Sequence, residues 1–248
     1  MKSKEDIASS YFSSLNNATD MEFLSKRKDV IYMRYDNFDN ANIAVSIKES
    51  MKSKKDISYI ILDLRENYGG NELEADTLLM SFLDIDTLVT YRSITRRDNA
   101  YYAAMGYGIE SYKAYYEETI LDTLAAEVLI KKDLPLYTQP LIILTSEKTC
   151  SAAEDFLITL KLHYPNRAII VGMPTAGSTG APFVRNLYGF YYRVCTRFPI
   201  TPAGMFEQGI RPDYHYERSI EEYMTGKDGI FEFVDEIMEK LNQKNNGI

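Results

Sequence analysis

The sequence has few of the residues that build metal sites and disulfide frameworks. Its 248 residues include two cysteines, two histidines and no tryptophan. Cys150 and Cys195 are not in a CxxC spacing, so we expect two buried free thiols rather than a disulfide. A typical zinc site needs several Cys or His ligands, and this composition therefore predicts neither a metal nor another cofactor.

Long apolar runs are also missing. No stretch reaches the roughly 20 apolar residues that span a bilayer, and the N-terminal MKSKEDIASSYFSS has no apolar core of a secretion signal. Two interpretations of the compartment follow: a cytoplasmic protein, or a trimmed piece of a longer one.

Positive charge is in deficit, with 28 Lys and Arg against 36 Asp and Glu, which gives a net charge of −8. This balance argues against nucleic acid or an anionic membrane as the main partner. The content of 45% hydrophobic and 26% charged residues is that of a globular chain, and the length suffices for a large core.

Strand and helix patterns alternate along the chain, which predicts an α/β fold. Residues 1–28 form a polar lead-in, and residues 29–248 form the core domain. Short β-branched apolar runs predict strands, and apolar residues at helical spacing predict helices. The strands are expected at 30–35, 59–64, 141–145, 168–172 and within 188–198, and the helices at 43–51, 72–83, 152–160 and 230–241.

The segment 86–136 differs in character from the rest. Six of the 20 tyrosines fall between Tyr101 and Tyr116, and the spacing of apolar residues from Leu121 to Ile130 predicts a helix. We interpret this segment as a helical cap inserted over the main sheet, with its aromatic residues used mainly in packing.

Ser151 lies where a predicted buried strand gives way to a helix. Backbone N–H groups at a helix start lack partners and carry partial positive charge. A nucleophile there would have an oxyanion site beside it, formed partly by the N–H of Ala152. Serine is also a preferred N-cap, so a purely structural role is the alternative.

Two glycine-containing segments follow other predicted strands. Gly69 and Gly70 could bring a backbone N–H close to a ligand, or could simply form a tight turn. The segment 172–179 is nearly a phosphate-binding loop, but Ser178 stands where that loop needs a lysine, which argues against nucleotide binding.

Four segments together resemble the C-terminal processing (tail-specific) serine peptidases, the family that includes the catalytic core of tricorn protease. They are YIILDLRENYGG at 59–70, LIILTSEKTCSAAE at 141–154, IIVGMPTAGSTG at 169–180 and EQGIRPDYHY at 207–216. The resemblance implies a ClpP/crotonase-like α/β spiral core. It places the nucleophile on Ser151 and an oxyanion hole on the N–H groups of Ala152 and of Gly69 or Gly70.

The general base is where the sequence departs from this family. The processing peptidases carry a lysine where Ser178 stands, and the tricorn-like branch uses an upstream histidine assisted by a serine and a glutamate. Glu207 matches that glutamate, and Ser178 is a candidate for the assisting serine. His163 and His215 both follow Ser151 and match no family position, so the resemblance implies a His base from an upstream region. His215 is the alternative base within the chain.

The sequence therefore favours a serine endopeptidase core that cleaves peptides or protein C-terminal tails, with peptide or unfolded protein as its partner. A non-catalytic peptide-binding module, or pseudo-peptidase, on the same fold is the alternative because the base is missing. An acyl-CoA enzyme is suggested only by fold analogy, which is a weak argument for function. If the chain is a trimmed piece, the resemblance implies an extracytoplasmic location.

Overall fold

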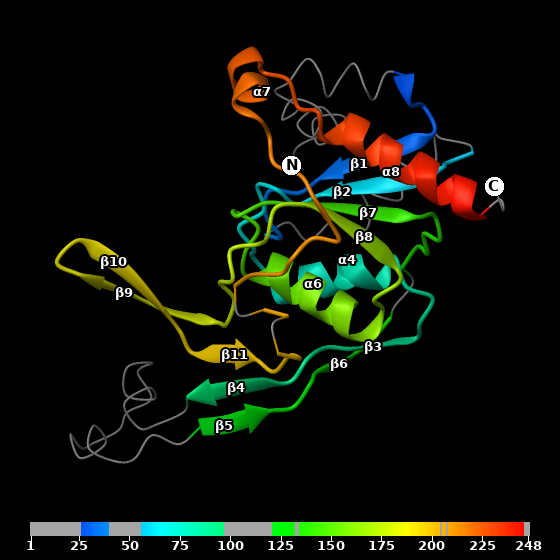
Figure 1. Cartoon of the computed structure of the whole chain (residues 1–248). Coiled ribbons are helices and arrows are strands. Elements are labelled where there is room, and N and C mark those ends of the chain that lie inside the picture. Colours follow the sequence, from blue (N-terminus) through cyan, green and yellow to red (C-terminus); the bar gives the residue numbers. More distant parts are fainter. Residues whose placement is uncertain are drawn as a thin grey trace, which may run out of the picture.

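A five-stranded parallel sheet forms the centre of the molecule (Figure 1). The computed structural model describes residues 26–39, 56–96, 121–131, 134–203, 205–206 and 208–245. The strand order is β1-β2-β7-β8-β12, and all four pairings are parallel. The strands are β1 (Val30–Arg34), β2 (Tyr59–Asp63), β7 (Leu141–Thr145), β8 (Ala168–Gly172) and β12 (Tyr214–His215).

The central strands are buried on both faces, which explains their continuous apolar runs. Ile60 and Leu62 of β2 pack into the cluster beneath α4 (Glu72–Met80) and α6 (Ala152–His163). Tyr59 and Ile61 point to the opposite face, against α8 (Ile230–Asn245). Figure 1 shows α8 on one side of the sheet and α4 with α6 on the other. The predicted α/β class is confirmed.

The predicted strands and helices of this core are confirmed where they lie in the described residues. The short helix α7 (Ile220–Thr225) begins with a capping box, in which the side chains of Ser219 and Glu222 each accept a hydrogen bond from the other's backbone N–H. The predicted helix at 43–51 and most of the lead-in at 1–28 lie outside the described residues.

The predicted helix at 121–130 is wrong. This stretch forms two strands, β5 (Leu121–Leu124) and β6 (Val128–Ile130), which pair antiparallel with β4 (Ser93–Arg96) and β3 (Thr87–Val89). Pairing with strands that lie 25 to 43 residues away in sequence outweighs the local apolar spacing. The described parts of 86–136 therefore contain strands where a helical cap was predicted, and the tyrosine-rich residues 101–116 lie outside the described part of the chain.

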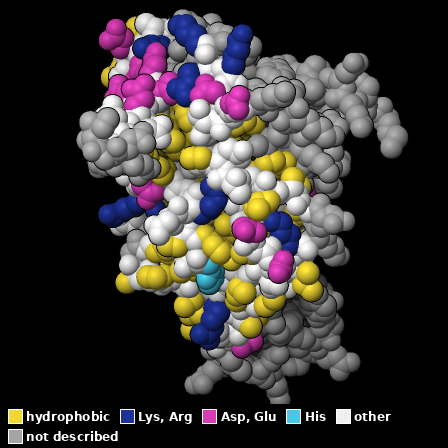
Figure 2. All heavy atoms as spheres, turned by 90° about the vertical axis from the view of Figure 1, so that its right-hand side faces the viewer, with side chains coloured by type: hydrophobic (Ala, Val, Ile, Leu, Met, Phe, Trp, Pro, Cys, Tyr) yellow, Lys and Arg dark blue, Asp and Glu magenta, His cyan; other side chains and the backbone are white. Residues whose placement is uncertain are grey.

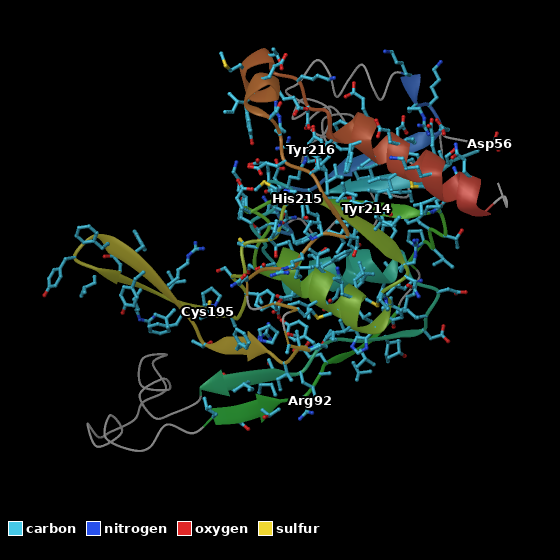
Figure 3. The ribbon with its side chains drawn as sticks, in the orientation of Figure 1. Asp56, Arg92, Cys195, Tyr214, His215 and Tyr216 are labelled. Atoms are coloured by element: carbon cyan, nitrogen blue, oxygen red, sulfur yellow. The ribbon has the colours of Figure 1, made fainter. Side chains whose placement is uncertain are left out.

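A hairpin of β9 (Pro182–Leu187) and β10 (Phe190–Cys195) projects from the core (Figure 1). It leads into β11 (Arg197–Pro199), which pairs with β4. Figure 3 places Cys195 at the base of the hairpin. Both cysteines are free, as predicted, but Cys195 is exposed and Cys150 only half-buried, so the prediction that both are buried is wrong.

On the face seen in Figure 2, basic and acidic side chains are interspersed, with hydrophobic side chains between them. No described helix is long and apolar enough to cross a membrane.

Candidate active site

Ser151 occupies a strained turn between β7 and α6. Its backbone has φ 57° and ψ −128°, a conformation rare for a residue with a side chain. Ser151 occupies the N-cap position of α6, but its side chain makes no capping hydrogen bond, so capping does not explain the serine at this position. Strain of this kind costs about 1–3 kcal/mol and gathers at functional sites. A sharp strand-to-helix turn of this sort presents a serine hydroxyl outward in many hydrolases.

Gly69 packs directly against the Ser151 turn. A Cβ atom placed on Gly69 would lie 2.5 Å from Ser151 Cβ and 3.0 Å from Ala152 N, and the Gly69 backbone has φ +98°. The Cys150 N–H also donates to the Asn67 carbonyl at 3.0 Å. Only glycine fits here, because both the close approach and the backbone conformation exclude a side chain.

Two backbone donors beside the turn have no acceptor among the described residues. They are the N–H groups of Ala152, the first residue of α6, and of Gly70. The N–H of Gly69, in contrast, donates to Asn67 Oδ1 at 2.8 Å. Of the two glycines singled out in the sequence, Gly70 is therefore the one whose N–H is available to a ligand.

Glu154 fastens the Ser178 loop to the first turn of α6. Its buried carboxylate accepts hydrogen bonds from Thr175 Oγ1 at 2.6 Å, Gly177 N–H at 2.7 Å and Ser178 N–H at 2.8 Å. The Ser178 carbonyl in turn accepts from the Ser151 N–H at 2.9 Å. Burial raises the pKa of Glu154, and these hydrogen bonds oppose the rise. The sequence reasoning missed this role, although a glutamate on the apolar side of a helix was a visible signal.

The segment at 207–216 joins the same loop. Ile210 N–H donates to Thr175 Oγ1 at 2.7 Å, and Thr175 N–H donates to the Ile210 carbonyl at 3.2 Å. Asp213 Oδ2 accepts from Ile170 N–H at 2.8 Å, which holds the segment to β8. All four segments that carry the resemblance therefore meet around Ser151. Glu207 itself lies outside the described residues.

Neither histidine hydrogen-bonds Ser151. His163 ends α6, about 18 Å from Ser151 at ~1.5 Å per residue, and its Nε2 lies 3.0 Å from the Thr90 carbonyl oxygen. His215 lies on the edge strand β12 (Figure 3), with its side chain 60% exposed and 4.0 Å from Glu217. Lys148 and Lys161 form ion pairs with Glu66 and Asp213. Neither of the two histidines and neither of these two lysines is therefore hydrogen-bonded to the serine.

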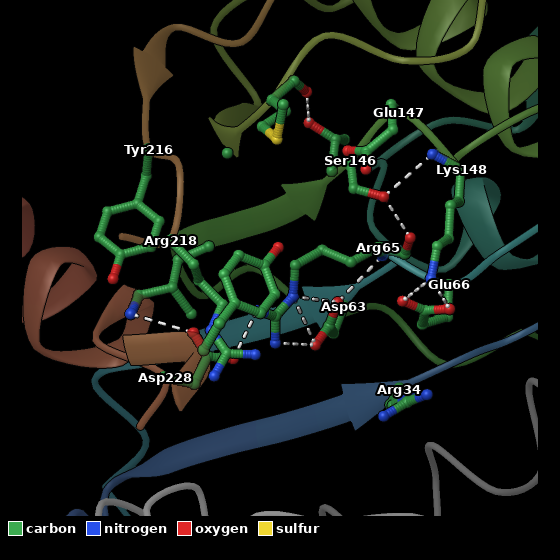
Figure 4. Close-up of a pocket in the computed structure, with 15 residues that line it drawn as sticks. Arg34, Asp63, Arg65, Glu66, Ser146, Glu147, Lys148, Tyr216, Arg218 and Asp228 are labelled. Carbon is green, nitrogen blue, oxygen red and sulfur yellow. Dashed lines mark hydrogen bonds and ion pairs between the residues drawn. The ribbon is translucent and has the colours of Figure 1, made fainter. Parts of the chain in front are cut away.

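Two cavities of different character lie near the ends of the strands. One, of ≈ 410 Å³, opens beside Ser151 and Gly70 and is also lined by α4 and α6. The other, of ≈ 210 Å³, surrounds Arg65 and does not include Ser151 (Figure 4). Among the described residues, no group of three or more His, Cys, Asp or Glu side chains could hold a metal ion.

Solved peptidase structures share this fold. A peptidase from Parabacteroides merdae ATCC 43184 matches with a TM-score of 0.65 and 21% identity, over 85% of this chain and 61% of that one. A photosystem II D1 C-terminal processing protease matches with a TM-score of 0.50 and 22% identity, over 76% of this chain and 42% of that one. Tricorn protease matches with a TM-score of 0.51 and 15% identity, over 90% of this chain and 19% of that one.

These structures are all substantially longer than the part that the chain matches, which is 61% of their length at most. No curated protein matches the chain. The sequence profile of Peptidase family S41 matches residues 29–216, which include the Ser151 turn, the Gly69–Gly70 loop and the Ser178 loop. Because this match spans most of the chain, the chain belongs to Peptidase family S41.

Proposed function

We propose that this chain is the core of a serine endopeptidase that cleaves peptides or protein C-terminal tails. The observation that carries the proposal is the Ser151 turn, because a strained serine stands beside two backbone N–H groups with no acceptor in the described structure. Membership of Peptidase family S41 supports the same reaction class. We also propose that the core has the ClpP/crotonase-like α/β spiral fold.

The chemistry is acyl transfer in two steps. Ser151 Oγ attacks the peptide carbonyl carbon while a general base takes its proton, and the carbonyl oxygen becomes an oxyanion held by the N–H groups of Ala152 and Gly70. Collapse of this intermediate expels the amine, which takes up the proton from the base. Water then attacks the acyl-enzyme and releases the carboxylic acid and free Ser151.

The base in this proposal is a histidine from a region upstream of the chain. The positions of His163 and His215 support this, because neither contacts Ser151. Glu207 and Ser178 would orient that histidine, and Glu154 would act as a positioning residue through the Ser178 loop. Loss of the contact between Glu154 and the Ser178 loop should lower the rate of cleavage more than the affinity for the substrate.

The alternative is a peptide-binding module without catalysis. One observation favours it: Ser178 occupies the position at which the processing branch carries its lysine, and neither histidine of the chain is hydrogen-bonded to Ser151. Such a module would retain the cavity and the backbone donors while binding peptides without turnover.

The experiment uses the full-length protein, with the upstream region present, and a serine-reactive phosphonate. We expect covalent labelling and peptide cleavage, both lost in Ser151→Ala. Ser219→Ala is the matched control, because it removes a helix-capping hydroxyl outside the cavity and should leave both intact. An unlabelled protein that cleaves nothing would reject the peptidase, and saturable peptide binding by that protein would establish the module instead.

A further inference from the structure

The cavity beside Ser151 is acidic. Its lining includes Glu72 and Asp76 from α4, Asp155 from α6 and Glu127 from the turn between β5 and β6. The same four carboxylates line an adjoining hollow of ≈ 50 Å³, which extends the cavity toward Arg197. A ligand that enters beside the serine therefore meets four acidic side chains from three different parts of the chain.

Little positive charge balances these groups. Arg197 forms an ion pair with Glu72 and donates a hydrogen bond to its carboxylate. Asp155 is satisfied by neutral hydroxyls, since it accepts from Tyr91 at 2.5 Å and from Thr179 at 2.6 Å. One guanidinium thus serves the four carboxylates that the two hollows share in their linings.

Asp76 is the group that points to a ligand. It is only 7% exposed, yet it has no hydrogen bond or ion pair with any described residue. Burying a carboxylate without a partner is costly, so such groups are normally paired. Burial raises the pKa of Asp76 to about 7, and the charges of Asp155 and Glu127 add to the rise. A cation in the cavity would remove this penalty.

The geometry favours an organic cation over a metal ion. The described carboxylates do not converge into a group that could coordinate a metal. Asp76 lies inside, whereas Glu127 is exposed. This arrangement suits a long side chain whose charge reaches Asp76 and whose stem passes the rim.

We propose that this cavity is a specificity subsite that takes a Lys or Arg side chain of the peptide substrate, with Asp76 as its main charge partner. This inference rests on the proposed function, because it assumes a peptide bound at Ser151. Glu127 and Asp155 contribute negative potential, and Glu72 is largely neutralised by Arg197.

The test separates binding from catalysis. Full-length protein carrying Ser151→Ala is titrated with short fluorescent peptides that differ at one position, Lys against norleucine and Arg against citrulline. Norleucine keeps the four-carbon chain of Lys without its amine, and citrulline keeps the full length of Arg, so each pair removes the charge. We expect the charged peptides to bind at least about tenfold more tightly, as a desolvated ion pair allows. Asp76→Asn should reduce the ratio to about two or three, the share that the other carboxylates supply.

Two further variants keep the test decisive. Glu127→Gln, at an exposed position, should reduce the Lys preference about twofold to threefold, as expected for a partly screened charge. Glu66→Gln, an exposed carboxylate of the other cavity, should leave it unchanged. If Asp76→Asn does not fold, an unaltered preference in Glu127→Gln would overturn the proposal.

The possible outcomes also distinguish this inference from the proposed function. Equal affinity for Lys and norleucine peptides would overturn the subsite, even if the Ser151 protein cleaves peptides. A Lys preference in a protein that never cleaves would support the subsite and reject the peptidase.

Discussion

The two cavities are lined by equal numbers of carboxylates but differ in the number of basic side chains that accompany them. The cavity around Arg65 is lined by four carboxylates and four basic side chains (Figure 4), whereas one basic side chain serves the four carboxylates beside Ser151. The first is a balanced network and the second has a net charge of −3 at full ionisation. Carboxylates in structural ion pairs and carboxylates in functional sites can both have shifted pKa values. The charged partners around each carboxylate indicate which of the two it is.

Asp63 and Asp76 show the contrast most directly. Burial alone would raise the pKa of Asp63, but the Arg65 guanidinium and its hydrogen bonds hold it below the usual value. Asp76 has no such partner, and its pKa rises to about 7. The two aspartates are similarly buried, at 2% and 7% exposed, so the difference lies in their partners and not in their depth.

The largest effect is expected on removal of Arg65. Its guanidinium donates to Asp63 at 2.7 Å and to Asp228 at 2.6 Å, and both carboxylates are buried. Arg65→Met would leave both charges unpaired, so we expect the free energy of unfolding to fall by about 3–5 kcal/mol. Urea unfolding measures this. The double variant with Asp63→Asn should recover part of the loss, and a loss below about 1 kcal/mol would contradict the contrast drawn between the cavities.

Glu154 represents a third arrangement, in which hydrogen-bond donors alone satisfy a buried carboxylate. Glu154→Gln would turn an amide NH₂ toward the donors of Gly177 or Ser178, so one buried donor would lose its acceptor. We expect a loss of about 2 kcal/mol in stability and a slower phosphonate labelling of Ser151. Glu147→Gln, on the other cavity, is the control and should label normally. Normal labelling of Ser151 in Glu154→Gln would contradict the positioning role proposed for Glu154.

The sequence pointed to the turn around Ser151 but not to the cavity beside it. Local motifs mark Ser151, Gly70 and Ser178, because each depends on the chain conformation within a few residues of a strand end. Nothing local marks Asp76, which resembles any polar residue on an amphipathic helix. Its isolation arises only where α4, α6 and the β5–β6 turn meet, and that turn was predicted to be helical. Contacts between residues far apart in the sequence explain both the wrong helix at 121–130 and the failure to single out Asp76.

Asp76→Asn should stabilise the protein, and more so at high pH. The folded pKa of about 7 lies above the ordinary value of 3.8, so the folded state binds the proton more tightly and stability is lost as pH rises between these values. The gain from Asn should therefore be about 2 kcal/mol larger at pH 8 than at pH 5. Unfolding in urea at both pH values measures it. Glu127→Gln should give no comparable gain, and a pH-independent effect of Asp76→Asn would show that the carboxylate is not destabilised.

The smallest effect is expected from Lys148, and it tests whether pairing alone explains the contrast. Lys148 Nζ lies 2.9 Å from both oxygens of Glu66, a distance close to those of the Arg65 pairs. Its side chain is 59% exposed and that of Glu66 46%, so water screens the attraction and solvates either group when the other is removed. Lys148→Ala should therefore change the free energy of unfolding by no more than about 0.5 kcal/mol. A loss as large as that of Arg65→Met would mean that short ion-pair distances, and not burial, make the Arg65 network stable.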